Sequence, residues 1–452
     1  MAIKFNLDKV FNNLQNISYD SLYQYFKTHH FQSLYVKQIN NDLVLIHNNS
    51  NKYDNDDLHN ECRSIIVSIK DSSTPKIVSY SHDNIEYSYM ESYINFNTDL
   101  IQESYEGTMV NVYNFNDKWH FSSTKCPSID DSYFFNKNKS HGDMFNEILK
   151  DIFPNSENVR EEFTKYLDVN KYYFFVIVHY ENKYLIDYSN RFGENYKKLI
   201  HVITRDKNTH IEESTKINIP IIYPKEYSSY TEAMTDELMN TDYTEGLIIK
   251  RKDTITNKNR LIKIPTKQYI KFRFEKPNYT NPLISCIEIF QRNNADYKSE
   301  DFIKKYYPSF DLKDGQKVLD ITGILHYMFK NLSTELSIIY NYFTHYDKTE
   351  NTFVKRNTTT YQNIIMKNDY KTLRNTINRL QNYQIKFLKR SFQYNDLLEH
   401  LRNYTSPNDI FNLLKEHNSL VTSKNELYKI VEVNMLNIEK YNKYVKLYIE
   451  KV

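Results

Sequence analysis

The sequence predicts an α+β domain built on mainly antiparallel sheets, followed by an all-helical domain. Short β-rich runs alternate irregularly with helical patches over the first 280 residues, without the regular strand-helix alternation that parallel sheets need. After residue 281 apolar residues recur at helical spacing and strand patterns disappear. We therefore predict one domain over residues 1–280 and a second over residues 285–452.

In the first domain, the predicted strands are short runs that alternate or are apolar, with Asn, Asp or Lys at their ends. They cover residues 43–46, 64–69, 76–80, 108–115, 118–123, 172–179, 183–188, 199–204, 247–251 and 261–264. Helical spacing predicts helices within residues 21–28, 144–152, 156–166 and 230–239.

The second domain is predicted to contain helices and no strands. Apolar residues at helical spacing cover residues 317–346, 361–388, 410–414 and 427–449. Two helix starts are well marked. Pro407 follows Ser406 at a first helical position, and Ser423 with Glu426 has the spacing of a capping box.

Composition excludes several classes of protein. With 59 basic and 57 acidic residues the net charge is +2. The 40% of hydrophobic residues can form a core, which excludes a disordered chain. None of the six glycines has the spacing of a P-loop or a dinucleotide-binding turn. The three cysteines lie far apart, which disfavours a disulfide framework or a zinc module. No apolar run reaches the ~20 residues that span a bilayer, so we expect a cytoplasmic protein without a membrane partner.

The positive charge is concentrated in the second domain, which carries +6 against −4 for residues 1–284. Seven cations are predicted to lie along one helix, and these are Lys367, Lys371, Arg374, Arg379, Lys386, Lys389 and Arg390. Such a helix can bind the phosphates of RNA. The alternative is an ordinary solvated helix face.

Two glutamate-glycine pairs, Glu106-Gly107 and Glu245-Gly246, each lead into a predicted strand. Other charged residues lie at the ends of or within neighbouring strands, in a fixed order along the chain. These elements are Glu61-Cys62-Arg63, Ser123-Thr124-Lys125, the segment from Phe175 to Tyr188, Arg205 and Lys263.

This ordered set resembles the covalent nucleotidyltransferases, and most closely the T-even phage RNA ligase 1 family. The resemblance covers about residues 40–275 and rests on six short motifs in the family's order; that family also ends in a helical domain. It implies a ligase-like fold, with ATP and Mg²⁺ as cofactors if binding is retained. It also implies a nucleotide pocket formed by Arg63, Glu106, Gly107, Lys125, Glu245 and Lys263, with Glu245 as the ligand of Mg²⁺.

Three positions depart from the family pattern. The lysine that attacks the α-phosphate of ATP in that family falls on Ser104, a family glutamate falls on Val176, and a second lysine falls on Pro265. A serine cannot form the lysyl phosphoramidate, and loss of a nucleophile alone removes most of a catalytic unit's effect. We therefore expect a ligase-like pseudo-enzyme that binds RNA, with tRNA among the candidates, or a protein of an RNA-processing assembly.

Two alternatives stay open. One is an active ATP-dependent RNA ligase or nucleotidyltransferase that uses a displaced lysine, with Lys125 as the nearest candidate. The other is a structural or protein-interaction scaffold, which the near-neutral net charge favours. The family resemblance and the surplus of Asn, Lys, Ile and Tyr suggest a viral source, and then the host cytoplasm as the location. The scattered histidines, such as His179 and His201, are predicted to be structural.

Overall fold

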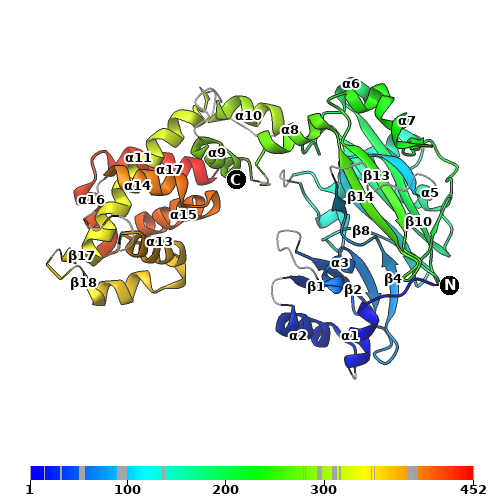
Figure 1. Cartoon of the computed structure of the whole chain (residues 1–452), viewed down its shortest axis with the longest axis horizontal. Helices are drawn as coiled ribbons and strands as arrows, with labels where there is room; N and C mark the ends of the chain where they lie inside the picture. Colours follow the sequence, from blue (N-terminus) through cyan, green and yellow to red (C-terminus); the bar gives the residue numbers. More distant parts are fainter. Residues whose placement is uncertain are drawn as a thin grey trace. The chain divides into compact units, whose positions relative to one another are not determined.

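The computed structural model describes residues 2–450 except 15, 31–32, 50–55, 89–98, 135–137, 278, 280, 293–297, 308–312, 315–316, 348, 351, 385–387, 389, 391 and 393. The chain divides into two compact units, residues 1–275 and 276–452, which are coloured by sequence in Figure 1. We call them the sheet unit and the helical unit. Together they form a mixed α+β protein with antiparallel sheets and many C-terminal helices, as the periodicity predicts.

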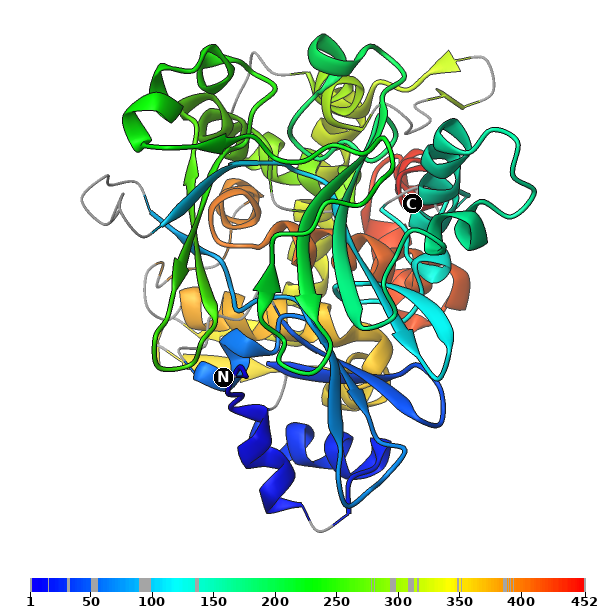
Figure 2. The same cartoon turned by 90° about the vertical axis from the view of Figure 1, so that its right-hand side faces the viewer.

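The first sheet is buried on both faces. Its elements are α1 (Leu7–Asn13), α2 (Tyr19–His29), β1 (Leu34–Gln38), β2 (Leu43–Asn48), α3 (Asp57–Glu61), β3 (Ile65–Ser68) and β4 (Lys76–Tyr80), and the strand order is β1-β2-β3-β4. Val44 and Ile46 pack with Leu22 and Phe26 of α2, and Figure 2 shows α1 and α2 in dark blue beside this sheet. Leu45, on the opposite face, packs against the second sheet, which explains why β2 is apolar throughout.

The second sheet lies between the first sheet and a pair of helices. Its elements are β7 (Thr108–Phe115), β8 (Lys118–Ser123), η2 (Ile129–Asp131), α4 (His141–Ile152), α5 (Val159–Thr164), β9 (Lys171–His179), α6 (Ser189–Phe192), β10 (Lys197–Asp206) and β11 (Glu212–Glu213), and the strand order is β11-β10-β9-β7-β8. Phe175 and Ile177 pack with Phe145 of α4. Tyr172 and Phe174 point the other way, into the cluster with Leu45 and Ile66, because side chains alternate along a strand.

The third sheet carries most of the predicted motif residues. Its elements are β5 (Glu86–Tyr87), β6 (Leu100–Ser104), β12 (Glu226–Tyr227), α7 (Tyr230–Thr235), η3 (Glu237–Asn240), β13 (Gly246–Lys252), β14 (Asn259–Pro265) and α8 (Lys267–Glu275), and the strand order is β12-β6-β13-β14-β5. Ile101, Ile249 and Ile262 pack with Ala233 of α7 on one face. Strand alternation therefore puts Lys263 on the other face.

The helical unit is organised around one long helix, α11. Its elements are α9 (Pro282–Gln291), α10 (Ser299–Tyr306), β15 (Lys313–Asp314), β16 (Lys317–Val318), α11 (Ile321–Phe343), β17 (Thr344–Asp347), β18 (Thr352–Lys355), α12 (Thr358–Thr360), η4 (Tyr361–Ile365), η5 (Asn368–Tyr370), α13 (Lys371–Tyr383), α14 (Tyr394–Asn403), α15 (Pro407–Ser423), α16 (Glu426–Asn434) and α17 (Ile438–Glu450). Helix α11 contacts α14, α16 and α17, and half of its residues are buried because it is apolar over more than one face.

A polar network is buried between helices of this unit. The His417 ring lies 3.0 Å from Glu335 Oε1 through Nδ1 and 2.9 Å from Asn442 Oδ1 through Nε2. Tyr441 donates its hydroxyl to the other oxygen of Glu335, at 3.1 Å. Asn442 donates its amide to Tyr428, so its oxygen faces His417. Both ring nitrogens therefore meet acceptors, which favours the imidazolium form of His417.

Several predicted elements are wrong in detail in the helical unit. Two short hairpins, β15–β16 and β17–β18, interrupt a unit predicted to be all helical. The predicted helix over residues 361–388 is instead a π turn, a 3₁₀ turn and then α13. The capping box at Ser423 is wrong as well: Asn425 caps α16, and Ser423 is the last residue of α15. The cap at Ser406 is confirmed, since its side chain accepts from the Asp409 amide.

Candidate functional site

Three motif positions form one row across the third sheet. Gly246 at the start of β13 is paired with Ser104 of β6 on one side and with Pro265 of β14 on the other. Ser104 and Pro265, the two positions where the sequence departs from the resembled motifs, are therefore both direct strand neighbours of the Glu245-Gly246 pair. Motifs that are 141 residues apart in sequence meet here.

Glu245 is the centre of a buried polar cluster at this row. Ser104 Oγ donates to its Oε2 at 2.5 Å, and Lys263 Nζ lies 2.6 Å from its Oε1. The Glu245 side chain is 4% exposed and that of Lys263 is 10% exposed. Burial tends to raise the pKa of Glu245, but the Lys263 charge and the hydrogen bonds from Lys263, Ser104 and Tyr269 outweigh it and hold this pKa below the ordinary value.

Glu106 binds the loop that contains Leu185 and Ile186. Its Oε2 accepts hydrogen bonds from the backbone amides of Leu185 and Ile186, both at 2.7 Å, and its Oε1 accepts from the Tyr269 hydroxyl at 3.1 Å. The Tyr188 hydroxyl in turn accepts from the Glu106 amide. This arrangement explains why the strand predicted over residues 183–188 is wrong, because two of its amides bind a carboxylate rather than a neighbouring strand.

The glycine after each motif glutamate is required by close packing. A Cβ on Gly107 would lie 2.7 Å from Val176 Cγ1 and 2.3 Å from the Ile177 carbonyl oxygen. Gly246 has a φ of +145° and a Cβ there would lie 2.1 Å from the Ile264 oxygen. The Val176 side chain is buried against Gly107.

Arg63 lies just before β3 and faces this cluster. Burial lowers the pKa of its guanidinium, and the nearby Tyr87 and Glu245 partly offset that effect. Among the described residues, Arg63 makes no hydrogen bond or ion pair with its side chain. Tyr87, which the sequence did not single out, is 45% exposed, and Lys263 Nζ lies 5.9 Å from its ring centre. The Arg273 guanidinium carbon lies 4.8 Å from the same ring centre. The guanidinium of Arg63 and a partly exposed aromatic ring that already contacts two cations are thus present beside the Glu245 cluster.

Lys125 follows β8 and is exposed. Desolvation lowers the pKa of its amine, and the positive charges of Arg63 and Lys37 lower it further. The Lys37 ammonium donates to the backbone oxygen of Lys125 at 2.6 Å. The charge of Arg63 affects the pKa of Lys125, and the charge of Glu245 affects the pKa of Arg63. These three predicted residues therefore lie near one another.

Two other motif residues have structural partners. Glu61 accepts from the amides of Asn6 and Leu7, both at 2.8 Å, and pairs with the buried Lys258 at 2.7 Å. Arg205 is fully buried and donates to backbone oxygens, including that of Ser81. These residues hold the first two sheets and the N-terminal segment together.

The residues present fit a phosphate group better than Mg²⁺. Both oxygens of Glu245 are taken by Ser104 and Lys263, and both oxygens of Glu106 are taken by amides and Tyr269. Mg²⁺, which binds through oxygen ligands, would have to compete with the Lys263 ammonium for Glu245. The predicted role of Glu245 as a magnesium ligand is therefore not supported by this geometry, whereas Arg63 can donate to phosphate oxygens.

A second cluster, Glu147, His179 and Glu181, brings three possible metal ligands within 4.8 Å of one another. Lys139 already pairs with both carboxylates. The His179 Nδ1 accepts from the Glu181 amide, so Nε2 carries the proton and donates to Glu147. The ring has no free lone pair, and the cluster is a satisfied ion-pair network, in line with the structural role predicted for His179.

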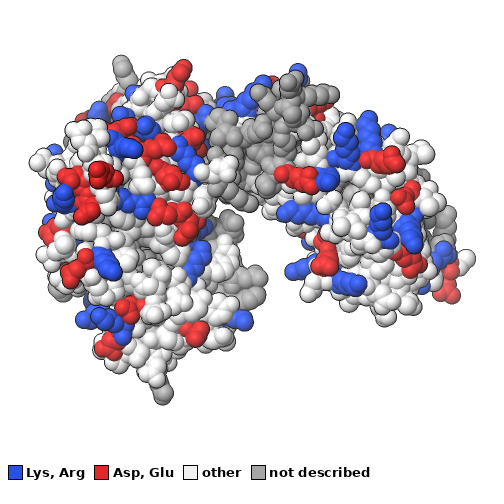
Figure 3. Space-filling view, turned by 180° about the vertical axis from the view of Figure 1, so that it is seen from behind, with Lys and Arg blue, Asp and Glu red and all other residues white. Residues whose placement is uncertain are grey.

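The predicted RNA-binding cations do not lie on one helix. Lys371, Arg374 and Arg379 are on α13, whereas Lys367 precedes it and Arg390 follows it. Lys386 and Lys389 lie outside the described residues. Arg379 pairs with Asp409 and Arg390 with Asp396. On the face of the helical unit visible in Figure 3, basic and acidic side chains are interspersed.

The sequence matches no protein-family model and no curated protein. It is similar to a solved structure described as "Putative ATP-dependent DNA ligase from Aquifex aeolicus", with 13% identity, a TM-score of 0.35, and coverage of 63% of this chain and 69% of that one. It is also similar to two forms of an archaeal ATP-dependent RNA ligase, each covering 73% of this chain and 83% of that chain. Form 1 has 9% identity and a TM-score of 0.35, and form 2 has 10% and 0.36. Among the described residues, no helix is long and apolar enough to span a bilayer.

Proposed function

We propose that this protein is a ligase-like pseudo-enzyme, which binds a nucleotide phosphate without forming a lysyl-AMP and acts by binding RNA or a protein of an RNA-processing assembly. The observation that carries the proposal is the hydrogen bond from Ser104 Oγ to Glu245. The position that needs an amine holds a hydroxyl whose proton is committed to a carboxylate. A phosphoramidate needs a nitrogen nucleophile, which Ser104 cannot supply.

The binding role rests on Arg63 and Tyr87. A guanidinium without a protein partner among the described residues is a strong donor to phosphate oxygens. A base could stack on the partly exposed Tyr87 ring by sharing it with Arg273 or displacing Arg273 from it. Base-aromatic stacking is worth about 1–3 kcal/mol. Lys263 can reach a phosphate only by leaving Glu245, so we expect weak binding in the absence of a further partner.

Covalent transfer is tested by incubating the protein with α-labelled ATP and Mg²⁺. We expect no acid-labile, alkali-stable label on the protein. Non-covalent binding is tested by calorimetry with ATP, in which Arg63→Gln should weaken binding at least tenfold. Arg260→Gln is the matched control, because Arg260 is exposed on β14 and paired with Glu86. Absence of ATP binding and of RNA binding by the wild-type protein would instead favour the scaffold alternative.

A second candidate function is favoured by one observation, the lowered pKa of Lys125. Deprotonation turns an ammonium into a nucleophile, so an amine whose pKa is lowered by desolvation and by the charges of Arg63 and Lys37 is suited to attack phosphorus. A protein adduct that forms with ATP and disappears in Lys125→Ala would establish an active nucleotidyltransferase with a displaced lysine. If Lys125→Ala formed the same adduct, Lys125 would be excluded as the nucleophile.

A further inference from the structure

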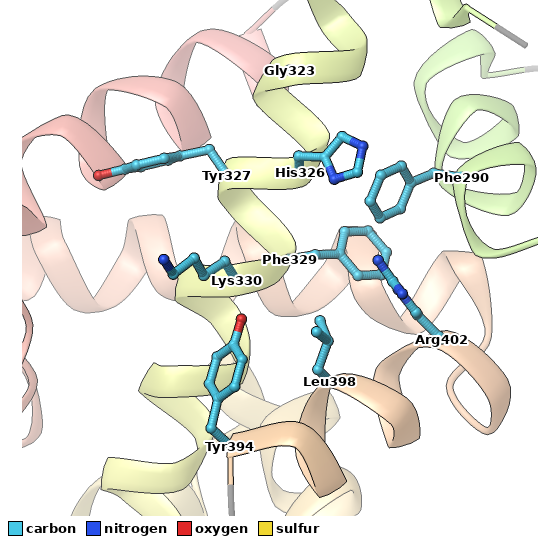
Figure 4. Close-up of a pocket in the computed structure, with 9 residues that line it drawn as sticks. All are labelled: Phe290, Gly323, His326, Tyr327, Phe329, Lys330, Tyr394, Leu398 and Arg402. Carbon is cyan, nitrogen blue, oxygen red and sulfur yellow. The ribbon is translucent and has the colours of Figure 1, made fainter. Parts of the chain in front are cut away.

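The helical unit contains a pocket of about 420 Å³ that is independent of the Glu245 cluster. Helices α9, α11 and α14 form its walls, and Figure 4 shows the side chains that line it. The residues are Phe290, Gly323, His326, Tyr327, Phe329, Lys330, Tyr394, Leu398 and Arg402. Its volume is within the range of roughly 300–1,000 Å³ that holds small molecules in proteins.

Aromatic rings and cations share this pocket. Four of its nine lining residues are Phe or Tyr, three are Lys, Arg or His, and none is acidic. Phe290 is the aromatic centre, with its ring 4.6 Å from His326 and 4.7 Å from Phe329. Figure 4 shows Lys330 and Arg402 projecting from different helices, with Leu398 between them. The lining thus combines flat apolar surfaces with positive charge.

Arg402 supplies the most specific observation. Its guanidinium carbon lies 5.5 Å from the centre of the Phe290 ring, which fixes the group against an aromatic face. Its Nε is buried and has no hydrogen-bond acceptor among the described residues. A buried donor without an acceptor destabilises the fold, and more so when the group is charged. The other two guanidinium nitrogens, which have no hydrogen bond or ion pair among the described residues, are the atoms that an anionic ligand in the pocket would bind.

We propose that this pocket binds one nucleotide, with its base against the aromatic rings and its phosphate on Arg402. A planar base suits the aromatic lining, and a phosphate suits a guanidinium in a lining without acidic residues. The ligand is either a free mononucleotide or one unpaired nucleotide of a single strand. This proposal stands on the helical unit alone and does not depend on nucleotide binding in the sheet unit.

The test is titration of the full chain with AMP and with adenosine, followed by calorimetry. We expect AMP to bind at least ten times more tightly than adenosine, and Arg402→Gln to reduce AMP affinity at least tenfold. Arg292→Gln is the matched control, because Arg292 follows α9, pairs with Glu288 and is absent from the lining. Equal affinities for AMP and adenosine, or no effect of Arg402→Gln, would overturn the proposal.

Photocrosslinking separates this pocket from the sheet unit. Labelling with 8-azidoadenosine monophosphate should modify peptides of α9, α11 or α14, whereas labelling only of peptides before residue 276 would refute the pocket. A single-stranded pentanucleotide that binds more tightly than AMP, and is equally sensitive to Arg402→Gln, would identify a strand as the source. AMP binding without pentanucleotide binding would identify a free nucleotide. Tighter binding of phosphotyrosine than of AMP would show that the pocket serves a phosphopeptide and would contradict our proposal.

Discussion

Lys263 and Glu245 form a buried ion pair, with Nζ 2.6 Å from Oε1, at the centre of the site. Each partner neutralises the other, and Ser104 binds the remaining carboxylate oxygen. Two charged residues that the sequence predicts to bind a nucleotide thus stabilise each other. Breaking the pair should therefore destabilise the sheet unit, and a phosphate that binds Lys263 would have to displace Glu245.

Removing one partner of this pair should destabilise the sheet unit more than removing both. Lys263→Met leaves the Glu245 carboxylate buried without its cation, which should lower the unfolding free energy by about 3–5 kcal/mol. Lys263→Met combined with Glu245→Gln should recover at least half of that loss. Urea unfolding followed by Trp119 fluorescence measures this, since the single tryptophan lies on β8 of the sheet unit. A double variant as unstable as Lys263→Met would contradict the account.

Substitutions of Glu61 and of Arg63 should have opposite effects: one should lower the stability and the other should weaken ATP binding. Glu61→Gln weakens a buried pair with Lys258 and should cost about 3 kcal/mol of stability. Arg63→Gln removes a side chain without an ion pair among the described residues, so it should change stability by less than about 1 kcal/mol. ATP binding should respond in the opposite way, falling in Arg63→Gln and persisting in Glu61→Gln. Unfolding curves and calorimetry with ATP on both variants measure these effects. Loss of ATP binding in Glu61→Gln but not in Arg63→Gln would contradict the role of Arg63 as the phosphate-binding residue.

The stability of the helical unit should fall as the pH rises through the titration of His417. Burial tends to lower the pKa of His417, but Glu335 and hydrogen bonds to Glu335 and Asn442 outweigh it and raise this pKa above the ordinary value of 6.5. A raised folded pKa stabilises the fold fully below the unfolded pKa, and this stabilisation is lost as pH rises through the folded pKa.

Hydrogen exchange of α11, α15 and α17 between pH 6 and pH 9 measures this effect, after correction for the intrinsic exchange rate. Protection should decrease with pH in the wild-type protein and much less in His417→Gln, which cannot titrate. His400→Gln serves as the control, since burial lowers the pKa of His400 to about 4 and it stays neutral over this range. Identical pH profiles for wild type and His417→Gln would contradict the buried imidazolium.

RNA binding, if it uses α13, should depend on Lys371 more than on Arg379. Arg379 is paired with Asp409, whereas Lys371 makes no ion pair within the described part of the chain. Lys371→Glu should weaken binding uniformly across RNA sequences and reduce the salt slope of the affinity by about 1. Fluorescence anisotropy at several salt concentrations tests this, with Arg379→Glu as the comparison. An equal effect of both reversals would show that the ion pair opens on binding.

The architecture could be predicted because its signals are local. Alternation in β7 and β14 and helical spacing in α11 lie within single segments. Strand β6 was missed because Leu100–Ser104 neither alternates cleanly nor is apolar throughout. Its identity as a strand comes from pairing with β13, a contact across more than 140 residues.

The order of the site's motifs along the chain could be read from the sequence, but the bonds between their side chains could not. The order of the motifs places Ser104, Glu245 and Lys263 in one predicted pocket, and in the structure Ser104 and Lys263 both contact Glu245. The predicted nucleotide binding stays a prediction. The order of the motifs did not indicate that Lys263 neutralises Glu245 or that Glu106 binds two amides of a loop, since such bonds depend on tertiary packing. The aromatic pocket around Phe290 has no local signature at all, because three separate helices supply its walls.

The packing at Gly246 has a consequence for how such proteins are recognised. No side chain fits between β13 and the Ile264 carbonyl, so the glycine is needed for the strands to pair whether or not any reaction takes place. Selection for folding alone would therefore keep this glycine, whatever residue occupies position 104. A search of genomes for the glutamate-glycine pair will find proteins that share this strand pairing, whether or not they catalyse a reaction.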